Sequence, residues 1–270
     1  MLGELREELL QIRDNEYTVP ADTDAYPYAQ LLLECLGSAD AELRDKLAYT
    51  TLAKWILRGE FRHKELRGLL LQALSPNGLF FQIGEAGTDS VFKRAFSVLV
   101  VPLALRVHER DPFLSEEQLE STAEQVIEYI YLEQDVRGYV PGKGWAHSVA
   151  HTADALAALA RTLPDGSLMP AMLDAILYAV SRDDLIYAHG EDERLASAVL
   201  ALRQADALAD DQWKAWLLEF AVLETDWFPE RDYIILNRKL LLRSLYFRAD
   251  EGFAALCLDG LQALQQLEHG

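Results

Sequence analysis

Apolar residues recur at helical spacing along almost the whole chain, and this periodicity limits the fold more than any other feature. A clear stripe consists of Phe92, Phe96, Leu99 and Leu103. Intervals of three and four residues are typical of an amphipathic helix. The alternating pattern of a strand is rare, and its best candidate, LFFQIG at residues 79–84, is too short to support a sheet alone. The sequence therefore predicts an all-α protein.

The breaks between the stripes place the individual helices. Helices are predicted over residues 66–74, 90–107, 116–133, 145–163, 170–180 and 192–208, and again after Pro229. Ser115 and Gln118 have the spacing of a capping box. The helices form pairs whose second members begin roughly 45 to 55 residues apart, close to the period of HEAT repeats. The predicted fold is one domain over residues 1–270, an α-solenoid of stacked HEAT-like helical pairs that forms a right-handed superhelix.

Charge and composition exclude several classes of partner. The formal net charge is -19 over 270 residues, and a negative field of this size repels nucleic acids and anionic membrane surfaces. Cys35 and Cys257 lie far apart without metal-ligand spacing, so we expect two reduced thiols. Residues 1–15 lack the apolar core of a signal peptide, and no apolar run is long enough to span a membrane. We expect a cytoplasmic protein.

A cluster of polar residues stands at the start of each predicted second helix. The clusters are GTDSVFKR at residues 87–94, GKGWAHS at 142–148 and HGEDER at 189–194, with LRDK at 43–46 and NRK at 237–239 as candidate further copies. If the pairs stack in register, the clusters converge along one edge of the inner surface. Helix capping alone would explain Asp89, Glu191 and Asp192. It explains poorly Lys93, Arg94, His147, His151 and Arg194.

Three segments resemble a known bacterial family. They are DVRGYVPGKGWAHSVAHTAD at residues 135–154, GTDSVFKRAFSVL at 87–99 and GEDERLASAV at 190–199. The family that they resemble is domain of unknown function family 2785, and the resemblance covers nearly the whole chain. It implies a helical protein in which the same polar clusters matter, and it implies no particular activity.

Two histidines of the central segment are candidate metal ligands. Four residues apart on a helix, His147 and His151 would share a face at about 6 Å and could hold one zinc ion. Ser148 stands where the HExxH pattern has glutamate, so that motif is absent. A third ligand would come from Asp89, His189, Glu191 or Asp192. Asp154 would orient His151, and a buried carboxylate would raise the pKa of either histidine. Alternatively, both histidines only hydrogen-bond to neighbouring carboxylates.

The turn before these histidines is a candidate anion site. The run PGKG at residues 141–144 leads into a predicted helix, whose free amides would suit a phosphate or carboxylate together with Lys143 and Arg137. The spacing is not that of a Walker A loop. The alternative is a glycine-rich turn with a solvated lysine, in which Arg137 pairs with Asp135.

Catalysis would use the same residues. Either histidine beside Asp154 forms a base and the group that orients it. Ser148 lies about 100° round the helix from His147, so it is a poor nucleophile, and no GxSxG elbow occurs. A water molecule activated by histidine, or by a histidine-bound metal, is the remaining nucleophile. Trp145 and Tyr139 would form a pocket wall or pack in the core.

The first hypothesis is a binding module without chemistry of its own. The predicted partner is a polar or anionic small molecule or peptide. No cofactor is expected beyond a divalent metal such as zinc at His147 and His151. Asn237 is suspected of facing the site as well. The predicted site comprises Asp89, Arg94, Arg137, Lys143, Trp145, His147, His151, Asp154, Glu191, Asp192 and Arg194. The alternative is a metal-dependent or histidine-based hydrolase that uses the same site. A pure protein-interaction scaffold would instead show an apolar groove.

Overall fold

The computed structural model describes residues 2–223, 225 and 227–267, and helices account for well over half of them. The elements in chain order are α1 (Leu2–Asp14), α2 (Ala25–Cys35), the π-helix η1 (Glu42–Tyr49), α3 (Thr50–Arg58), α4 (His63–Ala73), α5 (Ser90–Val98), α6 (Val100–His108), α7 (Glu116–Leu132), β1 (Tyr139–Val140), β2 (Gly144–Trp145), α8 (Ser148–Thr162), α9 (Met169–Ala179), α10 (Glu191–Gln204), α11 (Asp210–Glu219), α12 (Glu230–Arg248) and α13 (Glu251–Leu267). The all-α prediction is confirmed.

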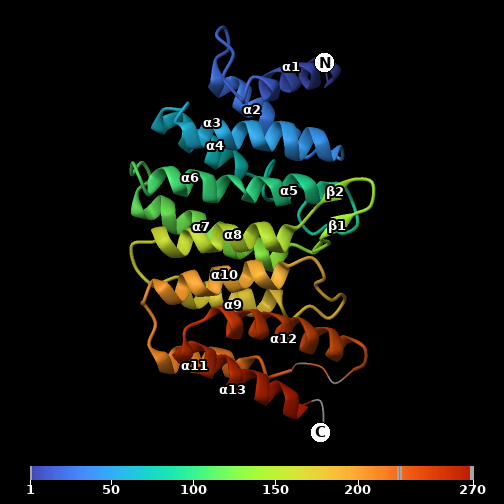
Figure 1. Cartoon of the computed structure of the whole chain (residues 1–270), viewed down its shortest axis with the longest axis vertical. Helices are drawn as coiled ribbons and strands as arrows, with labels where there is room; N and C mark the ends of the chain where they lie inside the picture. The colour runs from blue at the N-terminus through green and yellow to red at the C-terminus, as the bar shows by residue number, and fades with distance from the viewer. Residues whose placement is uncertain (1, 224, 226, 268–270) are drawn as a thin grey trace.

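The helices are stacked along the long axis of the molecule from α1 at one end to α13 at the other, in chain order except that α12 lies between α10 and α11 (Figure 1). One layer contains η1 with α3, α5 with α6, and then α8, α10 and α12. Within it α3 contacts α6, both α5 and α6 contact α8, α8 contacts α10, and α10 contacts α12. In the other layer α2 contacts α4, α7 contacts α9, and α11 contacts α13.

The predicted apolar stripes form the core between the layers. Phe92 and Phe96 of α5 are buried, as are Leu99 and Leu103 beside and within α6. Trp55 of α3 is fully buried too. Burying a side chain of this size contributes about 1.5–3 kcal/mol, so stripes like these supply most of the attraction between neighbouring helices. In the described part of the chain, no helix is long and apolar enough to cross a bilayer.

Several local predictions hold and others fail. The capping box is present: Ser115 Oγ accepts from the Gln118 amide at 3.3 Å, and the Ser115 amide donates to the Gln118 side chain at 3.0 Å. Residues 79–84, the best strand candidate, form turns instead of a strand. Their apolar side chains pack into the core, where Leu79 is fully buried.

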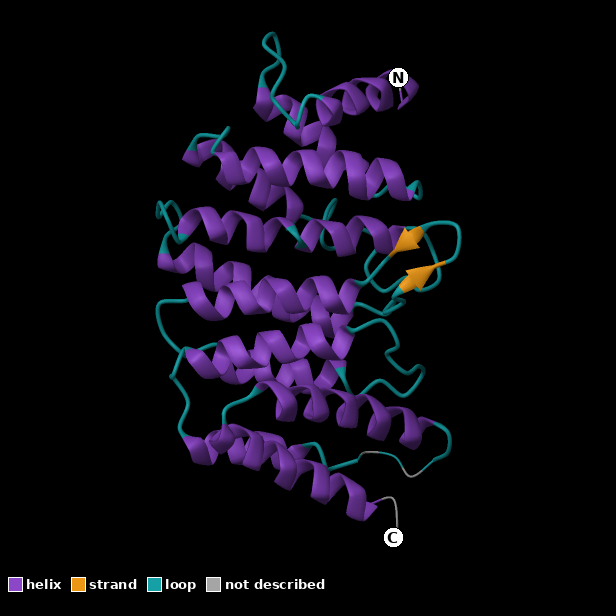
Figure 2. Cartoon of the chain, viewed as in Figure 1, coloured by secondary structure: helices purple, strands orange, loops and turns teal. Residues whose placement is uncertain are grey.

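The strands lie in the segment that was predicted to begin a helix. Helix α8 starts at Ser148, because the preceding residues form a short antiparallel hairpin of β1 and β2 at the edge of the stack (Figure 2). Gly142 and Gly144 have φ of +76° and +83°, a backbone conformation that favours glycine. The prediction of a helix from residue 145 was therefore wrong by three residues.

Asn237 does not face the predicted site, and the cluster at residues 237–239 does not begin a helix. Both lie within α12. The buried Asn237 side chain accepts from the Tyr187 amide at 2.9 Å and donates to the Leu185 carbonyl at 2.9 Å. It thereby fixes the loop between α9 and α10 against α12.

Replacing this amide should destabilise the fold. Asn237→Ala leaves a buried amide and a buried carbonyl unpaired, which costs about 1–3 kcal/mol. Urea denaturation followed by circular dichroism should show a lower midpoint. Arg243→Ala, on an exposed position of the same helix, is the control. Equal midpoints for the two variants would contradict this role of Asn237.

Candidate functional site

The hairpin of β1 and β2 is held in place by a buried arginine of η1. Arg44 is fully buried. Its guanidinium donates to the carbonyls of Lys143 at 2.9 Å and Trp145 at 3.2 Å, and it lies 4.1 Å from the centre of the Phe92 ring. The hairpin backbone and the aromatic ring together replace the hydration that the guanidinium loses on burial.

Two glycines allow the central segment to approach its neighbours. A Cβ on Gly144 would lie 2.8 Å from the Cβ of Ala41, and a Cβ on Gly138 would lie 2.3 Å from His189 Nδ1 and 2.8 Å from Glu191 Oε1. Such separations are well below van der Waals contact, so any side chain at these positions would push the hairpin away. The glycines of this segment therefore serve close packing.

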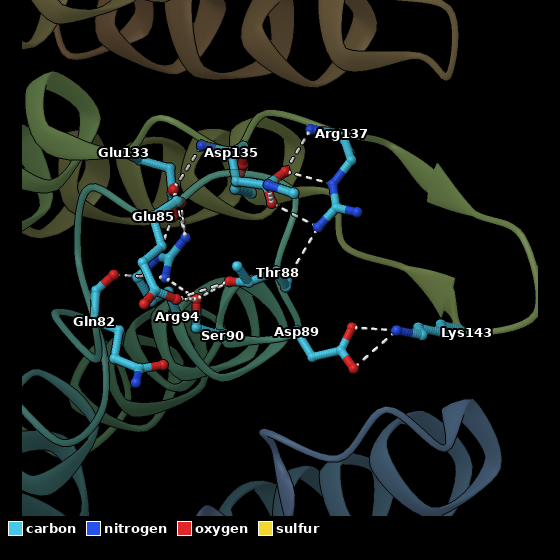
Figure 3. Close-up of polar contacts among 12 residues, drawn as sticks. Gln82, Glu85, Thr88, Asp89, Ser90, Arg94, Glu133, Asp135, Arg137 and Lys143 are labelled. Carbon is cyan, nitrogen blue, oxygen red and sulfur yellow. Dashed lines mark hydrogen bonds and ion pairs between the residues drawn. The ribbon is translucent and has the colours of Figure 1, made fainter.

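On the α5 side, the predicted residues pair with one another. Lys143 Nζ donates to both carboxylate oxygens of Asp89, at 2.6 and 2.8 Å, and Arg137 donates to Asp135 at 2.6 and 2.7 Å (Figure 3). Arg137 also donates to the Thr88 carbonyl at 2.7 Å. The alternative in which Arg137 pairs with Asp135 is the arrangement that the structure has.

Arg94 is the most completely bonded residue of the predicted set. It is fully buried, and its Nε and Nη2 donate to the two oxygens of Glu133 at 2.6 and 2.8 Å (Figure 3). Its remaining donors reach Ser90 Oγ and the carbonyls of the turn at residues 81–85. Glu133 also accepts from the Tyr129 hydroxyl at 2.7 Å.

On the α10 side, His147 meets Glu191. His147 Nε2 lies 3.4 Å from Glu191 Oε1 and 3.2 Å from the His189 carbonyl. Glu191 is buried and accepts from the His189 amide at 2.8 Å. Burial opposes its charge, but the His147 ring and two backbone amides outweigh burial and lower the pKa of Glu191. Partly exposed Trp145 stacks on the His147 ring at 4.4 Å.

Among the described residues, His151 forms no ion pair or hydrogen bond with a carboxylate. It is buried beneath α5, where its Nδ1 is 2.9 Å from the Ala95 carbonyl and its ring packs edge-on against Phe96. Burial lowers the pKa of His151 to about 3, and the positive charges of Arg194 and Arg44 add to this effect. The expectation of a raised pKa is wrong for this residue, because burial penalises the imidazolium and no acid compensates it.

The remaining predicted residues belong to contacts between helices. Asp154 of α8 accepts from Arg194 of α10, with Arg194 Nε at 2.7 Å, so it does not orient His151. Asp192 accepts from the Ser244 hydroxyl of α12 at 2.6 Å. The three polar clusters are thus linked pairwise across α5, α8 and α10.

This arrangement limits what the clusters can do chemically. Ser148 Oγ is buried and donates to the Asp135 carbonyl at 2.7 Å, so it is engaged as a structural donor. In the described ranges, no group of three or more His, Cys, Asp or Glu side chains is placed to hold a metal ion. The predicted base and orienting group was a histidine beside Asp154, but it is His147 and Glu191 that have the geometry of a base and its carboxylate partner.

A groove on the second-helix layer was not predicted. It has a volume of about 680 Å³ and crosses η1 with α3, α6 and α8. Tyr49 and Asp154 lie among its lining residues, together with Arg106, Arg110 and Arg161. Burial, followed by the charge of Asp154, raises the pKa of Tyr49 to about 12, so its hydroxyl stays a neutral donor at physiological pH.

The groove arginines have few partners within the chain. Arg161 Nε lies 3.4 Å from the Glu109 carboxylate. Across the described residues, the side chains of Arg106 and Arg110 have no ion-pair or hydrogen-bond partner. The sequence signal for both was only a basic residue near a helix C-terminus, which also occurs on ordinary solvated helix ends.

The comparisons with known proteins give a family but no activity. A family model described as Protein of unknown function (DUF2785) matches residues 79–247. The chain belongs to this family. The match begins after α4 and ends within α12, so it is shorter than the nearly complete coverage expected from the sequence. No curated protein and no solved structure matches the chain.

The buried histidine should make stability depend on pH. In the folded state the pKa of His151 is about 3, below its unfolded value of about 6.5. The folded state therefore binds fewer protons, and its stability is complete above about pH 6.5 and falls towards pH 3, by up to about 1.4 kcal/mol per pH unit. Urea midpoints across this range should fall less steeply for His151→Asn, and equal slopes would contradict the assignment.

Proposed function

We propose that the chain is an α-solenoid of HEAT-like helical pairs, a single domain wound as a right-handed superhelix, that binds a polar or anionic small molecule or peptide. The layered contacts support the solenoid, because each second helix packs against the second helices of neighbouring pairs. The two cysteines are free and buried, which fits a reducing compartment, and we propose the cytoplasm.

The observation that carries the binding proposal is the groove across α3, α6 and α8. Its volume of about 680 Å³ falls within the usual range of ligand pockets, which combine an apolar lining with a few convergent polar groups. At one end Arg106 and Arg110 supply two cations that no described residue pairs with, in a chain whose net charge is -19. Tyr49 supplies a neutral hydroxyl near Asp154.

The predicted polar clusters serve this function indirectly. Their ion pairs join α5, the hairpin, α8 and α10, and so hold the second helices in register. From the predicted site, Asp154 lines the groove, and Arg194 pairs with it. Because both side chains are partly exposed, this pair contributes little to stability and is free to exchange for contacts with a ligand.

A hydrolase is the second candidate, and one contact favours it. His147 Nε2 lies 3.4 Å from Glu191 Oε1, so the carboxylate would stabilise a protonated histidine that has taken a proton from water. Metal analysis of protein purified without added metal tests the metal-dependent form. Stoichiometric zinc that is lost in His147→Ala would support it, and zinc-free protein would oppose it.

Filling the groove should abolish ligand binding. Pro102 is a partly exposed residue of the groove, so Pro102→Trp places an indole in the hollow without replacing a buried side chain. We expect citrate, inorganic phosphate or a mixed-sequence peptide library to raise the melting temperature of the wild-type protein. The same probe should not raise that of Pro102→Trp.

The matched control is Pro170→Trp, at an exposed position of α9 in the other layer. This variant should respond to the probe as the wild type does. The proposal fails if no probe shifts the wild type, or if a probe shifts Pro102→Trp equally.

A further inference from the structure

We infer that the occupant of the groove is an acidic amphipathic segment of another protein, a proposal that rests on the proposed function of the groove. Two facing helix stripes carry the inference. Leu99, directly before α6, and Leu103, Arg106 and Arg110, on α6 and the turn that follows it, recur at intervals of three and four residues and line the groove, as does Pro102. Residues at these intervals share one helix face.

The second stripe repeats the same order on α8. Ala157 and Ala158 line the groove between Asp154, whose carboxylate pairs with Arg194, and Arg161 near the helix C-terminus. Helices α6 and α8 are in contact, and the Arg161–Glu109 pair joins their C-terminal ends. The groove therefore has an apolar floor and, at one end, three guanidinium groups.

The charges at that end select an anionic occupant. Arg106 and Arg110 are exposed, and within the described chain neither is neutralised by a carboxylate. The Glu109 carboxylate lies 3.4 Å from Arg161 Nε, so three arginines face one paired carboxylate. This end of the groove therefore carries a net positive charge within an acidic protein. Guanidinium groups bind carboxylates with paired hydrogen bonds. At physiological salt the distant negative charges are screened beyond about 8 Å, so the groove charges dominate at close range.

The apolar floor distinguishes a peptide from a small anion. A phosphate or citrate ion would satisfy the arginines but would leave Pro102 and Leu57, the more exposed apolar side chains of the lining, against water. An amphipathic segment covers both parts, with apolar side chains on the floor and carboxylates on the arginines. Arg106 and Arg110 are four residues apart at the C-terminal end of α6, a spacing that glutamates four residues apart on a bound helix would match.

A charge-swap experiment tests the inference at about 0.15 M salt. The probe is a fluorescein-labelled peptide of leucine and glutamate with glutamates four residues apart, and two further peptides carry glutamine or lysine in place of glutamate. Fluorescence anisotropy should show binding of the acidic peptide. Arg106→Glu/Arg110→Glu should weaken it about tenfold, since two favourable ion pairs become unfavourable, and should gain affinity for the lysine peptide.

The control variant is Lys214→Glu/Arg243→Glu, which makes the same change in net charge at exposed positions of α11 and α12. It should leave the affinity for the acidic peptide unchanged. Equal binding of the acidic and lysine peptides to the wild type overturns the inference, as does equal weakening by both variants. A third outcome is that the acidic peptide does not bind, whereas citrate or phosphate binds to the wild type and not to Pro102→Trp. In that case the groove is a ligand site, its occupant is a small anion, and the inference of a peptide is wrong.

Discussion

The buried pair of Arg94 and Glu133 fixes the geometry on which the other contacts depend. A buried charge is stable only when it is paired and hydrogen-bonded, and each partner also bonds to backbone groups outside its own helix. Arg94 binds the carbonyls at residues 81–85. Glu133, which caps the end of α7, binds the Asp135 amide at 2.8 Å and so directs the chain towards the hairpin. One ion pair thus joins the turn before α5 to the segment that leads into α8.

The two edges of the layer formed by the second helices consequently differ in how their charges are paired. Asp89 at the start of α5 meets the hairpin before α8, and His147 at the start of α8 meets Glu191 at the start of α10, so three helix N-termini lie together. The C-termini of α6 and α8 lie together through Glu109 and Arg161. At the first edge most charged side chains form internal ion pairs, whereas at the second the described part of the chain offers Arg106 and Arg110 no ion-pair partner. Recognition by charge is therefore available mainly at the C-terminal edge.

The sequence predicted the helices well because periodicity reports burial directly, as the stripe that begins at Phe92 illustrates. It failed at the hairpin, since the apolar spacing of Ala146 and Val149 continues the pattern of α8 although the backbone is not yet helical. The decisive restraints there are long-range: Arg44 binds the hairpin carbonyls from about a hundred residues away. The burial of His151 was missed for a similar reason, because α5 covers it only once the pairs have stacked. The groove was missed because it exists only where three separate helices meet.

The helix macrodipoles give a physical cause for the difference between the hairpin edge and the groove edge of the layer. Parallel second helices place their partial positive ends at the hairpin edge, where Asp89 and Glu191 lie, and their partial negative ends at the groove edge. Arginines at the negative helix ends stabilise the fold even without a ligand, because part of their positive charge interacts with the free helix carbonyls. The macrodipole amounts to only about half a charge per helix end, so the two helix ends and Glu109 leave the three groove arginines with about one positive charge in excess. That excess is small, so in the inferred complex the arginines would supply selectivity for an acidic partner more than affinity.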